Sequence, residues 1–198
     1  LKNVEVIGEY AFLSDSNYLT YVAIGNKENI VVLNEYNMRT AINESTSLIA
    51  KSTTKIYSVN EKVLAYATKN GLTYETLSVS ITSDKEELVK GGNVTFSSTV
   101  TGLDIIYAWM NGGVSISGAT SETYVDSSAT ATTKEISLKV TDVMGNEKVS
   151  NVIKVRYYSD NTYTLFEISE DGVLIKYHGT ATNVIVPEYL DKDINDGR

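Results

Sequence analysis

Apolar residues in the first part of this chain come in short stretches bounded by polar residues or glycine. The stretches span residues 4–12, 19–25, 30–33 and 56–59. Their length and spacing predict short strands rather than helices. None is long enough to build a core alone, so each is expected to pack on a neighbouring segment. Residues 40–53 fit neither pattern well and remain ambiguous.

One segment has the features of a helix, at residues 60–71 with the sequence NEKVLAYATKNG. Asn60 can cap its first turn, and Glu61 suits the positive end of the helix dipole. Gly71 can adopt the left-handed conformation that ends many helices. The pattern therefore predicts one short helix near residues 60–70.

From about residue 77 the apolar period becomes two, which is the period of a half-buried strand. Hydroxyl side chains alternate with the apolar ones, and Gly or Asn turns separate the stretches. The positions predicted to point inward are Val94, Phe96 and Val100; Ile105, Tyr107 and Trp109; Ile136, Leu138 and Val140; and Ile153, Val155 and Tyr157. This pattern predicts an antiparallel β-sandwich of about seven strands.

A third pattern starts near residue 160. Residues 163–179 alternate on either side of an Asp-Gly pair, which predicts a hairpin turning at residues 170–172. A further strand is expected at residues 183–190, which contain the only proline, Pro187. The acidic stretch 191–198 has no apolar anchor.

Composition narrows the functional classes. The chain has 198 residues and a net charge of −8, and its 17 basic residues are scattered, which argues against a nucleic-acid partner. It has no cysteine, so disulfides and thiolate chemistry are excluded. No apolar run approaches the roughly 20 residues that cross a bilayer. Because the first residue is Leu1, we read the chain as a processed product or a piece of a longer protein.

The first stretches resemble the BspA-type leucine-rich repeat of bacterial surface proteins. The residues that match its strand, "IG-x-x-AF" and "L-x-x-V-x-I" pattern are Ile7, Gly8, Ala11, Phe12, Leu19, Val22 and Ile24. Residues 56–74 resemble the closing unit of such an array, and residues 172–188 resemble an opening unit. The resemblance implies that residues 1–76 end one repeat array and that residues 159–198 begin another.

The middle of the chain resembles an Ig-like or PKD-like module, through Tyr107, Trp109, Tyr124 and the turn at 140–146. Without a cysteine pair it is not the disulfide-pinned antibody type. The expected fold is therefore mainly β, with leucine-rich-repeat-type solenoid fragments flanking an antiparallel Ig-like β-sandwich. The expected domains are 1–76, 77–158 and 159–198.

Few residues offer chemistry. Alternating Asp191, Asp193 and Asn195 match the start of a calcium loop, although Asp196 stands where that loop needs glycine; a solvated acidic loop is the preferred reading. His178 is the only histidine, and no G-x-S-x-G elbow accompanies it. The pairs Glu86 with Glu87 and Glu167 with Glu170 could in principle serve a glycosidase, but acidic pairs in turns are common. No catalytic residue or cofactor is expected.

Aromatic residues are the better binding candidates. Trp109 could stack on a sugar, but its strand position favours the sandwich core. An exposed aromatic face on the repeat array is expected from Tyr10, Tyr18, Tyr21, Tyr36, Tyr57 and Tyr66. A Lys–Asn isopeptide crosslink within the sandwich stays open, with Lys90, Lys134, Lys139 and Lys154 as donors.

The function expected from these observations is non-enzymatic. The resemblance implies a bacterial extracellular or cell-surface module that adheres to a surface protein or glycan of the host or of bacteria, with the sandwich as a spacer. Two alternatives remain: a filament or surface-layer subunit that associates head to tail through open solenoid ends, and an accessory module of a large carbohydrate-active enzyme. Neither a nucleic-acid partner nor a membrane span is expected.

Overall fold

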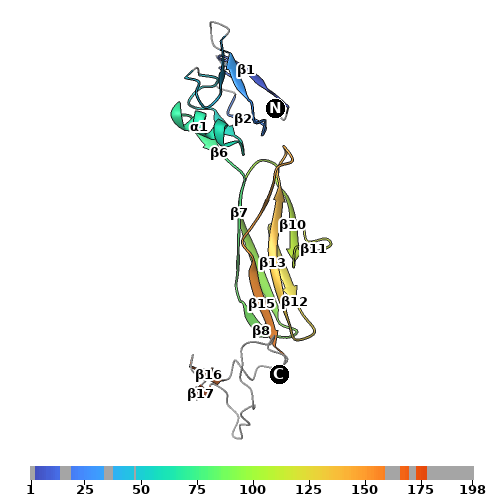
Figure 1. The fold of residues 1–198 in the computed structure, drawn as a ribbon. Helices are drawn as coiled ribbons and strands as arrows, with labels where there is room; N and C mark the ends of the chain where they lie inside the picture. Colours follow the sequence, from blue (N-terminus) through green and yellow to red (C-terminus); the bar gives the residue numbers. More distant parts are fainter. Residues whose placement is uncertain are drawn as a thin grey trace. The chain divides into compact units, whose positions relative to one another are not determined.

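The computed structural model describes residues 3–13, 19–33, 38–46, 48–158, 166–169 and 173–177. Within them the protein is mainly β with one short helix (Figure 1). The chain divides into two compact units. The first comprises Leu1–Ser80, Thr99–Tyr107 and Lys139–Val149, and the second comprises Ile81–Ser98, Ala108–Leu138 and Ser150–Arg198.

The first unit begins with very short strands, most of which pair in parallel. They are β1 (Val6–Gly8), β2 (Tyr21–Ala23), β3 (Val31–Leu33), β4 (Arg39–Ala41), β5 (Lys55–Tyr57) and β6 (Tyr74–Glu75). β1 pairs with β3, β2 with β5, and β5 with β6 in parallel, whereas β3 and β4 are antiparallel. Every apolar stretch predicted as a strand in residues 4–59 overlaps a strand of the structure. The start of the ambiguous segment 40–53 belongs to β4.

These strands share one hydrophobic core. The middle residue of each of four strands points into it: Ile7, Val22, Val32 and Ile56 are at most 6% exposed. Burying one such side chain contributes roughly 1.5–3 kcal/mol. Three-residue strands have little stability alone, so this shared core holds them together.

The predicted helix is confirmed as α1 (Glu61–Lys69). Oδ1 of Asn60 accepts hydrogen bonds from the backbone N–H groups of Lys62 and Val63, which is the expected cap. Gly71 follows the helix with a φ of 65°, where an L side chain is strained. The helix packs on the core through Val63, Tyr66 and Ala67.

The sandwich strands follow, from residue 78 to residue 158. They are β7 (Ser78–Ser83), β8 (Glu87–Val89), β9 (Asn93–Thr101), β10 (Ile106–Asn111), β11 (Val114–Ser115), β12 (Thr123–Ser127), β13 (Thr132–Thr141), β14 (Glu147–Val149) and β15 (Ile153–Tyr158). One sheet has the order β12-β9-β7, and the other has the order β11-β10-β13-β15-β8 with β14 paired to β13. β9 and β13, the second and fifth of the strands with five or more residues, lie in different sheets, as in an immunoglobulin-like sandwich.

The inward positions predicted for the sandwich are largely confirmed. Val94, Phe96, Trp109, Ile136, Leu138, Val140, Val155 and Tyr157 are fully buried. The Trp109 ring lies 5.9 Å from Phe96 and 5.7 Å from Tyr124 between centroids. An aromatic cluster therefore occupies the core of a sandwich that has no disulfide.

Two strands of the sandwich do not follow from the apolar period. β8 pairs in parallel with β15 and is the last strand in the order of its sheet. β14 is exposed along its length and pairs with β13. Exposed polar side chains hide such strands from an argument based on apolar period.

A final hairpin pairs β16 (Phe166–Ile168) with β17 (Leu174–Tyr177) in antiparallel fashion, as predicted. The Phe166 and Tyr177 rings pack with centroids 5.1 Å apart. The predicted turn at 170–172 and the strand at 183–190 lie outside the described residues.

Candidate functional site

The tyrosines predicted to form an exposed face do not share one environment. Tyr10 is 54% exposed and adopts a φ of 56°. Tyr21 is half-buried and stacks on Tyr57, with ring centroids 6.2 Å apart. Tyr18 and Tyr36 lie outside the described residues. Of the described candidates, Tyr10 alone is largely accessible to a partner.

The expectation of exposure is wrong for Tyr57 and Tyr66, which are both fully buried. The Tyr66 hydroxyl accepts a 2.9 Å hydrogen bond from the backbone N–H of Ile49, so the ring fills the core and its polar end is satisfied. The side chain of Tyr57 reaches a carboxylate instead. Tyrosine suits both sites because its ring packs while its hydroxyl finds a buried partner.

The partner of Tyr57 is Asp142, which follows β13. The Tyr57 hydroxyl donates a 2.5 Å hydrogen bond to Oδ2 of Asp142. Oδ1 accepts from the backbone N–H groups of Met144 and Asn146 at 2.9 and 2.8 Å, and Oδ2 also accepts from Nδ2 of Asn146 at 2.8 Å. Asp142 is only 3% exposed, so these four donors replace water around a buried carboxylate.

The same contacts perturb the ionisation of both groups. Burial would raise the pKa of Asp142, but the hydrogen bonds from Tyr57, Asn146 and Met144 outweigh it and hold that pKa below its usual value. Burial, the hydrogen bond to Asp142 and the charge of that carboxylate raise the pKa of Tyr57. Tyr57 is therefore a neutral donor and Asp142 an ionised acceptor. These ionisation states indicate no proton transfer between Tyr57 and Asp142, so we interpret the two residues as a structural pair.

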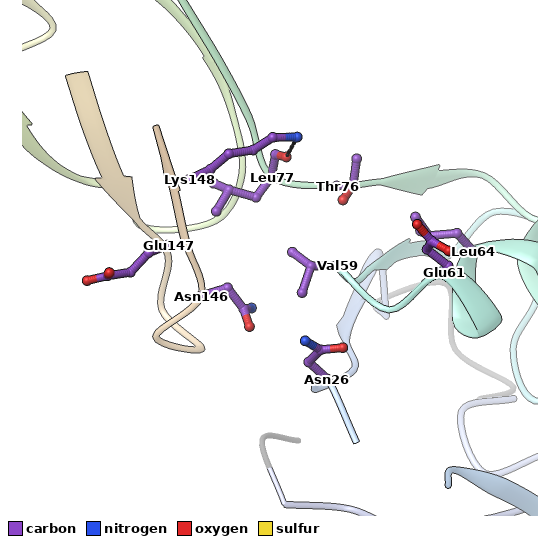
Figure 2. A pocket seen from close by; sticks show the side chains of 9 residues that line it. All are labelled: Asn26, Val59, Glu61, Leu64, Thr76, Leu77, Asn146, Glu147 and Lys148. Atoms are coloured by element: carbon purple, nitrogen blue, oxygen red, sulfur yellow. Dashed lines mark hydrogen bonds between the residues drawn. The ribbon is translucent and has the colours of Figure 1, made fainter. Parts of the chain in front are cut away.

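An open cleft of about 470 Å³ also lies in the first unit. It is lined by Asn26, Val59, Glu61, Leu64, Thr76, Leu77, Asn146, Glu147 and Lys148 (Figure 2). Nζ of Lys148 donates to the carbonyl oxygen of Leu77 at 3.2 Å, and Glu147 is paired with Lys139 at 3.1 Å. The lining offers two amides, two carboxylates, one hydroxyl and one ammonium group beside aliphatic side chains, without a nucleophile and a base in contact.

A second carboxylate cluster lies in the second unit. Asp126 accepts hydrogen bonds from the hydroxyls of Tyr124 at 2.9 Å and Tyr157 at 2.8 Å, and Nζ of Lys134 lies 2.9 Å from its Oδ2. Burial and the contact with Asp126 raise the pKa of Tyr124 to about 12. The cluster pairs every polar group it buries, as expected of a structural network.

The remaining chemical candidates that the structure describes take ordinary surface positions. Glu86 and Glu87 are exposed, and Glu87 accepts a 3.3 Å hydrogen bond from Tyr158. Glu167 is exposed as well, while Glu170, His178, Asp191, Asp193 and Asn195 lie outside the described residues. Glu86 and Glu87 do not line the cleft beside α1, and the pair of Glu167 with Glu170 lies partly outside the described residues.

Three of the four lysines proposed as isopeptide donors form ion pairs with acids. Lys134 pairs with Asp126, Lys139 with Glu147, and Lys154 with Glu135 at 3.3 Å. The backbone N–H of Lys90 donates to the carbonyl oxygen of Tyr158. These ion pairs do not test the Lys–Asn crosslink, which stays a prediction.

Within the described ranges, His, Cys, Asp and Glu side chains form no group of three that could hold a metal ion. Among the same residues, no helix has the length and apolar character needed to cross a bilayer.

The sequence matches no protein-family model and no curated protein. Among solved structures, the chain is similar to the fibronectin(III)-like modules of Clostridium thermocellum CbhA, with 19% identity over 42% of this chain and 98% of that chain, at a TM-score of 0.37. It is also similar to the N-terminal four Ig domains of Dscam1 isoform 7.44, with 17% identity over 43% of this chain and 22% of that chain, at a TM-score of 0.31. The assignment of an immunoglobulin-like sandwich rests on the strand order given above.

Proposed function

We propose that this chain is a non-catalytic binding segment of a bacterial cell-surface protein. In this proposal residues 1–76 end a leucine-rich repeat array of the BspA type, residues 77–158 are an Ig-like spacer, and residues 159–198 begin a second array. The segment is extracellular and binds a surface protein or a glycan. It requires no cofactor.

One observation carries the proposal. The apolar residues that match the repeat pattern lie in one core: Ile7, Val22 and Ile24 are buried there, and Phe12 and Leu19 pack against it. In the same region β1 pairs with β3 and β2 with β5 in parallel. Stacked layers of short parallel strands, each covering the apolar face of the next, are the physical basis of a repeat array.

In this proposal the binding surface lies on residues 1–76, the leading segment. Tyr10 presents a large, rigid side chain at low entropic cost, which is why tyrosine is common in recognition surfaces. The cleft beside α1 adds amide groups that can hydrogen-bond to a peptide or sugar. The acidic charge of the whole chain favours neutral or basic partners over polyanions.

The proposal is tested with the full chain against a panel of immobilised extracellular proteins and glycans. Saturable binding to one member, with no turnover of that member, is the expected result. Robust hydrolysis that a single carboxylate substitution abolishes would overturn the proposal. Binding to polysaccharides alone would favour the accessory-module alternative.

A second candidate function, head-to-tail self-association, is favoured by the edge position of β1. β1 is the outer strand in the order β1-β3-β4, and its residue Val6 is 37% exposed. Unpaired strand edges recruit further strands, and a lysine on the edge blocks this. Sedimentation velocity over a wide concentration range tests the idea. Self-association is supported if the chain forms larger species at high concentration and Val6→Lys suppresses them. A strict monomer at all concentrations contradicts it.

A further inference from the structure

Among the residues that the structure describes, hydrogen bonds from residues up to Thr76 reach the sandwich ends of the first unit, residues 99–107 and 139–149, at two places. One lies near the chain connection: Oε1 of Glu75 accepts from the backbone N–H of Gly102 at 3.1 Å, and Oγ1 of Thr101 donates to the carbonyl oxygen of Thr76 at 2.6 Å. The other is the Tyr57–Asp142 hydrogen bond, between residues 85 positions apart in the sequence.

The two places differ in what they can restrain. Contacts beside the connection at residues 76–77 leave rotation about that connection possible, because they lie close to its axis. The contact at β5 lies one strand over, because Tyr57 pairs with Glu75 of β6. It adds a second attachment, from a different strand, beside the first and so restricts that rotation. Two attachments on different strands make a stiffer joint than one.

The Tyr57–Asp142 contact joins residues that are far apart in the sequence, and it is also specific. The same carboxylate organises the turn from residue 142 to residue 146, because it holds the N–H groups of Met144 and Asn146. The turn is closed further by the N–H of Gly145, which donates to the Asp142 carbonyl oxygen at 2.9 Å. The acceptor is therefore already oriented before Tyr57 binds, and little entropy is lost when the hydrogen bond forms.

We propose that Tyr57 and Asp142 form a latch that fastens β5 to the turn at residues 142–146 and makes the first unit one rigid body. The latch also sets the width of the cleft, because Asn146 lines it from the latched turn while Asn26 and Val59 line it from the leading segment (Figure 2). This inference goes beyond the proposed binding function and does not depend on it.

The test measures a distance distribution in the full chain by double electron–electron resonance. The chain has no cysteine, so spin labels can be placed by Ala65→Cys on the exposed side of α1 and Val149→Cys on β14. Both positions belong to the first unit. Circular dichroism and urea unfolding first establish that each variant is folded.

The expected result is one narrow distribution in the doubly labelled parent and a broadened one after Tyr57→Phe. Asp142→Asn is the second variant, because it keeps the shape of the side chain and weakens the same hydrogen bond; it should broaden the distribution too. Tyr157→Phe is the matched control, since Tyr157 donates to Asp126 in the second unit and its loss should leave the distribution narrow. An unchanged narrow distribution in folded Tyr57→Phe, or a broad one in the parent, would overturn the proposal.

Discussion

The hydroxyl of Tyr157 donates a 2.8 Å hydrogen bond to Oδ2 of Asp126, and this pair repeats within the sandwich the geometry of Tyr57 with Asp142. Tyr157 is fully buried and Asp126 is 6% exposed. In both places the tyrosine ring packs in a hydrophobic core. Its hydroxyl donates a hydrogen bond that offsets the free-energy cost of burying a carboxylate. Tyrosine cannot be replaced by phenylalanine at such sites without leaving an acceptor short of a donor.

Tyr157→Phe should therefore lower the free energy of unfolding by about 1–3 kcal/mol, the cost of an incompletely satisfied buried polar group. The measurement is urea unfolding at neutral pH, with Val125→Ala as a control because Val125 is 55% exposed. An exposed substitution of this kind should change the free energy of unfolding by less than about 0.5 kcal/mol. Equal stability of the two variants would show that the Asp126 network does not stabilise the sandwich.

Tyr21→Phe should behave in the opposite way. The Tyr21 hydroxyl is buried with no hydrogen-bond partner, while its ring stacks on Tyr57. Phenylalanine keeps the stacking and removes an unsatisfied polar group, so at neutral pH the free energy of unfolding should stay the same or rise by up to about 1 kcal/mol. A lower free energy of unfolding for Tyr21→Phe than for the parent, measured by urea unfolding, would mean that the hydroxyl has a partner in solution.

The same substitution should reduce the loss of stability in alkali. Burial, with the charges of Glu75 and Asp142, raises the pKa of Tyr21 from 10.0 to about 12, so folding favours the neutral phenol. Its contribution is complete below pH 10 and is lost as the pH rises toward 12, because the unfolded chain then binds fewer protons than the folded chain. Urea unfolding at several pH values across this window should show a shallower decline for Tyr21→Phe than for the parent. If the free energy of unfolding falls equally with pH in Tyr21→Phe and in the parent, the raised pKa of Tyr21 is contradicted.

Gly102→Ala tests the backbone beside Glu75. Gly102 has a φ of 147°, and an added Cβ would lie 2.5 Å from Cδ1 of Ile105 and 3.0 Å from Cδ1 of Leu77. The backbone strain alone should cost about 1–3 kcal/mol of the free energy of unfolding. Gly8→Ala is the control, because nothing lies within 4 Å of its added Cβ and its φ is not in the left-handed region. Thermal or urea unfolding that finds both variants equally stable would refute the strain.

Local signals in the sequence were enough to predict the helix and most of the sandwich. Asn60 and Gly71 mark the ends of α1 through backbone chemistry that acts within a few residues. Alternation in β9, β13 and β15 predicts their buried faces, because a strand that is covered on one side must alternate. Both kinds of signal are contained within the segment that folds.

The position of tyrosine hydroxyls could not be predicted in this way. Tyr57 and an exposed tyrosine look alike in the sequence, because the difference lies in a carboxylate 85 positions away. The parallel partner of β8 was missed for a similar reason, since pairing with β15 depends on a distant strand and not on apolar period. The sequence places Asp142 in a turn, where an aspartate commonly accepts hydrogen bonds from nearby backbone N–H groups. Its second role, as the acceptor for Tyr57, depends on a residue far away in the sequence.

In the proposed function the leading segment binds a partner while the sandwich is a spacer. The most direct test is the dissociation constant of the full chain for the partner found in the binding panel, compared among the parent, Tyr10→Ala and Val125→Ala. Loss of a large exposed contact residue should weaken binding about tenfold or more, so Tyr10→Ala should have this effect and Val125→Ala should have none. Binding that Val125→Ala weakens and Tyr10→Ala leaves unchanged would place recognition on the sandwich and contradict the account.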